Sequence, residues 1–416
     1  MTGNDLPLLL TDVPGPASRS WVDRLARHEC PAITARRARR AASLGAADTD
    51  PIVWAEALGA NVRDVDGNVF VDLCAGFGVA AVGHRNPAVV TAGQDQLGRL
   101  PHAMGDAFPD LRRIELLEKL CALTGMDRVL LGCSGSDAVE AALKTARLAA
   151  PGRTRVLAFT GGYHGLASAP LAALGYHVGA FREPFTDMLG QHVDHAPFGG
   201  AWPDLHGYAA VLVEPIQGRG GMRAPPPGWL ARLHAEARAA GALVIHDEIY
   251  SGLGRAGQVL AAGDLRPDLL CLGKALGGGF PISACLGTAA AMDAWGASTG
   301  EAIHTQTFLG NPVGCAMALA VLEVLDREQL AARAAAEGAR FAEALAALPG
   351  VRAVTGSGLM LGVHVDDSLG VTRRMLGRGF IVLPCGERAE ALGITPPLTI
   401  SRALLDATVD TLAECL

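Results

Sequence analysis

Short apolar runs alternate with amphipathic stretches through the middle of the chain. Segments with the helical period fall between many of these runs, among them Ser136–Ala149 and Trp229–Ala240, and Gly241 is expected to end the second of these helices. Continuous apolar strands separated by helices are typical of a sheet that is covered on both faces. The pattern therefore predicts an α/β fold with a mostly parallel sheet, whose strands we expect at Arg128–Gly132, Arg155–Phe159, Ala209–Val213, Ala242–His246, Leu269–Leu272 and Ser283–Gly287.

The two ends of the chain have other patterns. The first fifty residues form a polar arm that contains prolines, with a short helix expected around Trp21 to His28. The stretch Asn61–Asp72 predicts a hairpin with Asp66-Gly67 at its turn. From about Pro312 onward, long Ala-rich helices predominate, and the last one places Leu404, Leu405, Thr408, Val409 and Leu412 on one side. This last part is predicted to form a smaller C-terminal domain.

Length and composition exclude several classes of protein. The 416 residues suit one large domain plus a smaller one, or three small domains. No apolar run reaches the roughly 18 residues that span a bilayer, and the first residues lack the pattern of a secretory signal, so no membrane partner is expected. The nine cysteines include no Cys-x-x-Cys pair, and no metal site is predicted. Six of them are expected to be small buried thiols in a reducing, cytoplasmic compartment: Cys74, Cys121, Cys133, Cys271, Cys285 and Cys315.

Charge gives little reason to expect a nucleic-acid partner. The formal net charge is −7, which supplies no general attraction to phosphates. One basic cluster, Arg36-Arg37-Ala-Arg39-Arg40, permits a nucleic-acid interpretation, but a solvated helix or one that contacts another subunit is favoured.

An amine and a carboxylate follow two of the apolar runs. Lys274 comes just after Leu269–Leu272 and just before three glycines, and Asp247 ends the run that begins at Ala242. Pyridoxal 5'-phosphate (PLP) needs these two groups, because the amine forms a Schiff base with its aldehyde and the carboxylate keeps its pyridine nitrogen protonated. A single lysine on a loop usually has no special role, but here other strand ends also carry polar groups. In open parallel sheets, ligands bind at the edge formed by the carboxyl ends of the strands.

Two of these strand ends could hold an anion and an aromatic ring. Gly135 and Ser136 open a helix, where free backbone N–H groups favour a phosphate; the alternative is a serine that only caps the helix. Tyr163 follows glycines after a strand and could lie flat on a ring, or it could simply pack. His164 beside it is more often a hydrogen-bonded structural histidine than a catalyst.

Two further strand ends carry carboxylate, amide and hydroxyl groups. Glu214 could pair with a cation, and Gln217 could lie near the phenolic oxygen of the cofactor; the alternative is a polar strand end that faces water. Thr305 and Thr307 precede a helix and offer hydroxyls, or they cap that helix.

The order and spacing of these motifs resemble the class III (omega) aminotransferases, a group that includes the 4-aminobutyrate and ornithine aminotransferases. The motifs are Ser-Gly-Ser-Asp-Ala, Tyr-His-Gly, Glu-Pro-Ile-Gln-Gly, Asp-Glu, Lys-Ala-Leu-Gly-Gly-Gly-Phe-Pro and Thr-Phe-Leu-Gly-Asn-Pro, and the similarity runs from about Ala60 to Leu398. The resemblance implies PLP fold type I, the aspartate-aminotransferase type, with a small domain drawn from both chain ends. Residues 1–75 would then form the arm and part of the small domain, 76–315 the large PLP-binding domain, and 316–416 the rest.

The resemblance also implies roles for individual residues. Lys274 would bond the cofactor and shuttle the proton, and Asp247 would hold the pyridinium. Tyr163 and Ile249 would cover the two ring faces, and Gln217 would approach the phenolic oxygen. Gly135 and Ser136 would bind the phosphate, and Thr307 would reach the phosphate of a neighbouring subunit, so that a homodimer shares two active sites. His164 and Glu214 are counted with the cofactor-binding residues.

Three departures from the family pattern bear on the substrate. Arg219 stands where relatives often have Glu, Leu166 follows Tyr-His-Gly in place of Arg, and Gly393 occupies the place of a carboxylate-binding Arg. Another cation must then bind a substrate carboxylate, or the substrate must lack it. The candidates are Arg388, Arg402 and Arg255. We expect poor use of 2-oxoglutarate unless one of these enters the site, and a Glu214 that is free to receive a cationic group.

The predicted function is that of an aminotransferase which moves an amino group between an amine or omega-amino acid and a 2-oxo acid. Amino-acid racemases or epimerases and an aminomutase of the same fold group share most of these residues. A nucleotide-dependent oxidoreductase is disfavoured, because no Gly-x-Gly-x-x-Gly follows the first strand of a dinucleotide-binding unit. A non-enzymatic protein with the same fold is also disfavoured, because both Lys274 and Asp247 are present.

Overall fold

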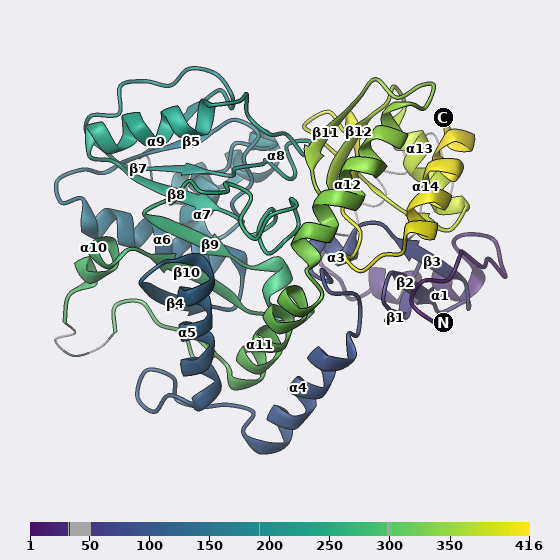
Figure 1. Cartoon of the computed structure of the whole chain (residues 1–416), viewed down its shortest axis with the longest axis horizontal. Coiled ribbons are helices and arrows are strands. Elements are labelled where there is room, and N and C mark those ends of the chain that lie inside the picture. The colour runs from purple at the N-terminus through teal and green to yellow at the C-terminus, as the bar shows by residue number, and fades with distance from the viewer. Residues whose placement is uncertain (32, 34–50, 191, 298–299, 301) are drawn as a thin grey trace.

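The protein has two lobes, and both chain termini lie in the same one (Figure 1). The computed structural model describes residues 1–31, 33, 51–190, 192–297, 300 and 302–416. The basic cluster at residues 36–40 therefore lies outside the described residues. Within them, no helix has the length and apolar character needed to cross a membrane.

A seven-stranded sheet forms the centre of the larger lobe. Its strand order is β4-β10-β9-β8-β7-β5-β6, and only β10 runs antiparallel to its neighbours. The strands are β4 (Arg128–Gly132), β5 (Arg155–Phe159), β6 (Val193–Ala196), β7 (Tyr208–Val213), β8 (Leu243–Asp247), β9 (Leu269–Leu272) and β10 (Ser283–Gly287). The six strands expected from the sequence are present. Strand β6 escaped prediction because it pairs only with β5 and two of its four residues are polar.

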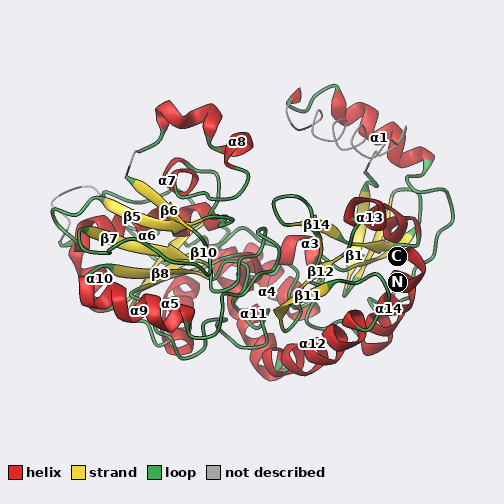
Figure 2. Ribbon diagram, turned by 90° about the horizontal axis from the view of Figure 1, so that it is seen from above, coloured by secondary structure: helices red, strands yellow, loops and turns green. Residues whose placement is uncertain are grey.

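Helices cover both faces of this sheet (Figures 1 and 2). Helix α6 (Gly135–Ala149) packs on β9 and β10, and α9 (Trp229–Ala240) packs on β7 and β8. The central strands are consequently buried along their length, which is why they read as unbroken apolar runs. The other helices of the larger lobe and of the junction are α3 (Ala75–Gly78), α4 (Pro87–Arg99), α5 (Leu111–Thr124), α7 (Ser168–Ala172), α8 (Val178–Phe181), α10 (Ala289–Met292) and α11 (Pro312–Arg327), with short 3-10 turns η1 (Glu183–Met188), η2 (Lys274–Gly277) and η3 (Asp293–Trp295).

The smaller lobe joins segments from the two ends of the chain. Strand β13 from the C-terminal part pairs in parallel with β3, so that Phe380 lies beside Val71. Two four-stranded sheets result, β1-β2-β3-β13 and β11-β12-β15-β14. Their elements are β1 (Trp54–Leu58), β2 (Asn61–Asp64), β3 (Val69–Asp72), β11 (Ala353–Ser357), β12 (Met360–His364), β13 (Phe380–Ile381), β14 (Leu383–Cys385) and β15 (Ala391–Ile394), accompanied by α1 (Pro16–Ala26), α12 (Leu330–Ala346), α13 (Ser368–Gly377) and α14 (Arg402–Cys415).

Two local expectations need correction. Helix α1 begins at Pro16 instead of near Trp21, because the carboxylate of Asp66 accepts hydrogen bonds from the first backbone N–H groups, those of Ala17 at 2.7 Å and Ser18 at 2.8 Å. Cys121 and Cys133 are only partly buried, whereas the other four thiols named above are buried. The division at residues 75 and 315 stays a prediction.

Glu248 directly follows β8, and its buried carboxylate makes the stability of the folded protein depend on pH. Its carboxylate accepts hydrogen bonds from the backbone N–H groups of Ala261 at 2.6 Å and Ala262 at 3.1 Å. Burial nevertheless raises the pKa of Glu248 from 4.5 to about 7, and the charge of Asp247 adds to this effect against the two hydrogen bonds. The folded protein therefore holds a proton on Glu248 that the unfolded chain releases at lower pH.

We predict that Glu248 lowers the free energy of unfolding as pH rises from about 4.5 to about 7. Below this range both states are protonated, and above it the folded state has to bury an ionised carboxylate, with a change on the order of 1–3 kcal/mol. In urea unfolding measured at several pH values, Glu248→Gln should reduce the fall of the unfolding free energy across this pH range. The exposed Glu118→Gln is the control and should leave the slope as it is. Equal slopes in wild type and Glu248→Gln would contradict the prediction.

Candidate active site

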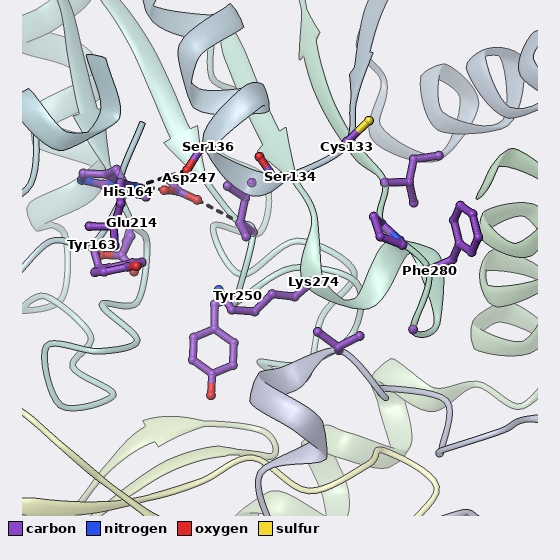
Figure 3. Close-up of a pocket in the computed structure, with 18 residues that line it drawn as sticks. Cys133, Ser134, Ser136, Tyr163, His164, Glu214, Asp247, Tyr250, Lys274 and Phe280 are labelled. Atoms are coloured by element: carbon purple, nitrogen blue, oxygen red, sulfur yellow. Dashed lines mark hydrogen bonds and ion pairs between the residues drawn. The ribbon is translucent and has the colours of Figure 1, made fainter. Parts of the chain in front are cut away.

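The carboxyl edge of the large sheet opens into a cavity of about 480 Å³. Parallel strands end at the same edge, so groups that are far apart in the sequence meet there. Lys274 follows β9 and Asp247 ends β8, and Figure 3 shows both among the residues that line the cavity. Other lining residues come from the loops after β4, β5 and β7: Ser134, Gly135, Ser136, Tyr163, His164 and Glu214.

Lys274 projects from the start of η2 into this cavity. Its Nζ lies 4.4 Å from the ring centroid of Tyr250. Burial lowers the pKa of Lys274, and nearby Arg219 lowers it further, while Asp247 and Glu214 act in the opposite direction. A lysine with a lowered pKa holds more of its amine in the unprotonated, nucleophilic form.

The glycines after Lys274 let the chain turn sharply at the neighbouring helix. Gly278 has a left-handed φ of +55°, and a Cβ there would lie 2.8 Å from Cγ2 of Val321 in α11. A larger residue would thus strain the backbone and push against α11. The glycine run fixes where η2 ends and so helps to fix Lys274 at its start.

Asp247 is held from two sides. Its Oδ2 lies 2.8 Å from Nδ1 of His164, and its Oδ1 accepts a hydrogen bond from the backbone N–H of Ile249 at 3.1 Å. Both side chains of the His164–Asp247 pair are buried. Burial alone lowers the pKa of His164, but the hydrogen bond to Asp247 and the carboxylate charge outweigh it and raise the pKa overall. The raised pKa favours a protonated His164, whose Nδ1–H would donate to Asp247 and orient the carboxylate.

The start of α6 closes one end of the cavity. Ser134 is the capping residue, since its Oγ accepts from the backbone N–H of Asp137 at 3.2 Å and the Asp137 carboxylate accepts in return from the N–H of Ser134. The alternative of a merely capping Ser136 is thereby excluded, and Ser136 Oγ instead accepts from Leu166 N–H at 3.3 Å. A Cβ on Gly135 would lie 3.0 Å from Cδ1 of Ile249, so glycine lets the Ile249 side chain pack against the start of the helix.

Glu214 is already engaged by the backbone. Its two carboxylate oxygens accept from Tyr163 N–H at 2.9 Å and from Gly218 N–H at 3.1 Å. Burial raises its pKa to about 7, His164 counteracts this, and Asp247 reinforces it. The carboxylate thus ties together two loops, and the expectation that Glu214 receives a cation of the substrate stays a prediction.

Gln217 does not line the cavity. Its Nε2 donates to the backbone oxygen of Thr160 at 2.9 Å, and its Oε1 accepts from Nη2 of Arg223 at 3.0 Å. The expected approach of this amide to the cofactor's phenolic oxygen therefore needs correction. In the structure the amide joins the end of β5 to the loop after β7.

The two threonines lie away from this cavity. Thr307 is exposed, and Thr305 Oγ1 donates to Asp106 Oδ2 at 3.2 Å. Neither residue caps α11, because Asn311 does so by accepting from the N–H groups of Val313 and Gly314. A role for Thr307 in another subunit stays a prediction.

A second cavity of about 550 Å³ adjoins the first on the side of the smaller lobe. Tyr163, Tyr250 and Lys274 line both. Its walls are otherwise aromatic, apolar or small: Ile33, Cys74, Phe77, Tyr176, Met222, Leu383, Pro384, Cys385, Gly393 and Thr395. Among its described lining residues, Lys274 and Arg219 alone carry charge.

None of the three arginines expected to bind a carboxylate lines either cavity. Arg402 is exposed and paired with Glu337. Arg255 is buried and donates to the backbone oxygens of Leu359 and Pro396. Arg388 is exposed.

The arginine that lines the second cavity is Arg219. The sequence already held the signal for it, since Arg219 follows directly on the strand-end motif that begins at Glu214.

The residues at this edge fit the expected cofactor. The lysine amine and the carboxylate share one cavity, Tyr163 and Ile249 present side chains to it, and the start of a 15-residue helix points N–H groups at one end. PLP has an aldehyde, a ring nitrogen, an aromatic face and a phosphate, and each finds a matching group here.

Comparison with known proteins identifies relatives along almost the whole chain. The family model described as aminotransferase class-III matches residues 44–199 and 206–416. The chain is 36% identical over 375 residues to acetylornithine aminotransferase of Methanothermobacter thermautotrophicus, covering 88% of this chain and 93% of the relative. It is also 36% identical over 400 residues to acetylornithine aminotransferase of Mycobacterium tuberculosis, covering 92% and 96%.

Solved structures agree with this relationship. Ornithine aminotransferase from Toxoplasma gondii superimposes with a TM-score of 0.85 at 29% identity, covering 96% of this chain and 94% of that one. A PLP-bound amine transaminase from an uncultivated Pseudomonas species gives a TM-score of 0.80 at 29% identity, covering 88% and 95%. The predicted fold type I architecture is confirmed.

Gly165, beside the start of α6, offers a test of this geometry. It has a φ of +108°, and a Cβ there would lie 2.1 Å from Oγ of Ser136. We predict that Gly165→Ala destabilises the protein by about 1–3 kcal/mol more than Gly152→Ala does. Gly152 is the matched control, because it also has a positive φ, +83°, but has open space around it, so that its substitution costs only about 1–2 kcal/mol of backbone strain. Equal losses in urea unfolding would refute the contact with Ser136.

Proposed function

The chain belongs to the class-III aminotransferases, which are PLP-dependent transferases of amino groups to 2-oxo acids, and on this premise we propose that Lys274 is its catalytic lysine. One observation carries the proposal: the Lys274 amine, with a lowered pKa, enters the same cavity as the buried Asp247. Of the three lysines in the chain, Lys119 and Lys144 are exposed on the surface. Lys274 is therefore the lysine placed to react.

PLP, when bound, supplies an aldehyde for the lysine and a pyridine ring that accepts electrons from the substrate's carbon. Lys274 Nζ would accept the proton that leaves this carbon and hold it for its redelivery, which requires an amine that is unprotonated part of the time. Asp247 would hold the ring nitrogen, with His164 and the Ile249 N–H fixing its two oxygens. Because these two contacts already orient the carboxylate, it needs no rearrangement during the reaction.

The remaining lining residues would position the cofactor. Gly135 and Ser136 would hold the phosphate at the start of α6, where the helix dipole and free N–H groups favour an anion. Tyr163 and Ile249 would flank the ring. Residues 76–315, which contain all of these groups, would act as the cofactor-binding domain.

The amino donor that we propose carries a terminal amine and a carboxylate. The relatives named above are acetylornithine and ornithine aminotransferases, and both of those donors have this arrangement. The apolar second cavity, which continues from Lys274, has room for a chain between the two groups. A 2-oxo acid would be the acceptor.

We predict that Lys274→Ala folds but loses amino transfer by roughly 10²–10⁴-fold or more, because it removes both the attachment point and the proton carrier. Borohydride treatment of the PLP-loaded wild type, followed by mass mapping, should place the pyridoxyl group on Lys274. Lys144→Ala is the control and should keep full turnover and labelling. Label on Lys119 or Lys144 in place of Lys274, or substantial turnover by Lys274→Ala, would refute the assignment.

We also propose that the protein is a homodimer whose Thr307 reaches the phosphate site of the partner. Two segments, residues 101–111 and 303–311, lie side by side at the surface. Asn311 Nδ2 donates to the backbone oxygen of Pro101 at 2.9 Å, and the rings of His102 and Phe308 are 5.5 Å apart. Together they expose five large apolar side chains, which would be covered in a dimer: Met104, Phe108, Leu111, Ile303 and Phe308.

We predict that Phe308→Asp yields a monomer in sedimentation velocity, since it places a charge in the proposed contact, and that this monomer binds PLP weakly because Thr307 of a partner is missing. Met188→Asp, at another exposed apolar residue outside these segments, is the control and should sediment as wild type does. A wild-type monomer with full activity would contradict both the dimer and the shared phosphate site.

A further inference from the structure

We infer that Arg219 is the carboxylate receptor of this enzyme, and that its substrates are amino acids with one carboxylate on an otherwise uncharged body. This inference rests on the proposed function, because it takes Lys274 as the residue at which the amine reacts. It concerns Arg219, which stands where the family pattern often has Glu.

Arg219 sits at the tip of a rigid loop. Two backbone hydrogen bonds between Gln217 and Arg223, of 2.8 and 3.0 Å, close the loop at its base. The backbone N–H of Gly386 donates to the oxygen of Arg219 at 2.9 Å, which ties the loop to the smaller lobe. The backbone of Arg219 is thus held in place before a ligand arrives, and little backbone entropy has to be lost on binding.

Aromatic rings support the guanidinium. Its Cζ lies 4.6 Å from the ring centroid of Tyr163, 5.3 Å from that of Tyr176 and 5.9 Å from that of Phe181. Ring contacts stabilise the cation through its face and use none of its five N–H donors. Among the described residues, no carboxylate forms an ion pair with Arg219 and no side-chain or backbone oxygen accepts from its guanidinium.

The surroundings make an anion the matching ligand. Arg219 and Lys274 are the two charged groups among the described residues of the second cavity, and both are positive. Once Lys274 is bonded to the cofactor, Arg219 is the charged group that remains among these residues; it would repel a second cationic group on a ligand, whereas a carboxylate would pair with its fork of donors. Diamines and cationic amines are accordingly disfavoured.

Among the described residues, the part of the wall around Gly393, Leu383 and Pro384 carries no charged side chain, which suits an uncharged substrate body. A Cβ on Gly393 would lie 3.2 Å from Cε of Met222 and 3.4 Å from Sγ of Cys385, so these side chains fill the space beside the glycine. A long cationic side chain has no room at Gly393 without displacing them. The wall formed with Leu383 and Pro384 offers no second partner for a dicarboxylate.

The experiment compares ligands that differ only in the carboxylate. For the PLP-loaded enzyme, kcat/KM is measured with 5-aminopentanoate and with pentylamine, and binding of the unreactive pentanoate is measured by calorimetry. Wild type should prefer 5-aminopentanoate over pentylamine. Arg219→Gln should lower this preference and the affinity for pentanoate roughly ten- to a hundredfold, because it removes a paired set of charged hydrogen bonds. Arg219→Lys should fall in between, since it keeps the charge but not the fork.

Arg388→Gln is the matched control, because it removes an exposed arginine near the same loop and should change neither quantity. Unchanged pentanoate affinity in Arg219→Gln, an equal loss for pentylamine and 5-aminopentanoate, or no pentanoate binding by wild type would overturn the inference. Failure of the proposed function is distinguishable, because it would appear as wild-type protein that transfers no amino group to a 2-oxo acid, whatever its affinity for pentanoate.

Discussion

Three buried carboxylates at one edge of the large sheet organise the loops around the site. Glu214 binds the N–H groups of Tyr163 and Gly218, Asp247 binds His164 and the N–H of Ile249, and Glu248 binds the N–H groups of Ala261 and Ala262. A buried carboxylate without hydrogen bonds would be strongly unfavourable, so each one draws loop backbone toward it. The loops that shape the cavity therefore depend on acids that do not themselves need to react.

The same acids set the electrostatics of the site. Burial and mutual repulsion raise the pKa of Glu214 and of Glu248 to about 7. Asp247 differs from them in its partner, because His164 provides a second ionisable group at hydrogen-bond distance. Glu214 and Asp247 line the first cavity, Arg219 lines the second, and Lys274 lines both. The amine is therefore shared by the cavity that contains the acids and the cavity that contains the arginine.

Much of the fold follows from local patterns. Four of the six expected strands have the predicted bounds, and α9 spans the predicted residues, because buried strands and capped helices leave strong signals in sequence. The start of helix α1 was misplaced, because the residue that caps it, Asp66, lies 48 residues after Ser18 in the sequence. Strand β6 was missed, because it is an edge strand with one partner. Long-range contacts of this kind leave no trace in a local window.

The sequence was sufficient to identify the reacting groups and to predict that they meet, because Lys274 and Asp247 each lie at the end of a buried strand and parallel strands end at one edge. The roles of the neighbouring polar residues became clear only from the folded chain. Glu214 and Gln217 turned inward to satisfy backbone and side-chain partners, and His164 became the support of Asp247. Spacing along the chain fixes the strand end on which a side chain sits. Its direction and partner are fixed by loop packing, which minimises unpaired buried polar groups across the whole edge.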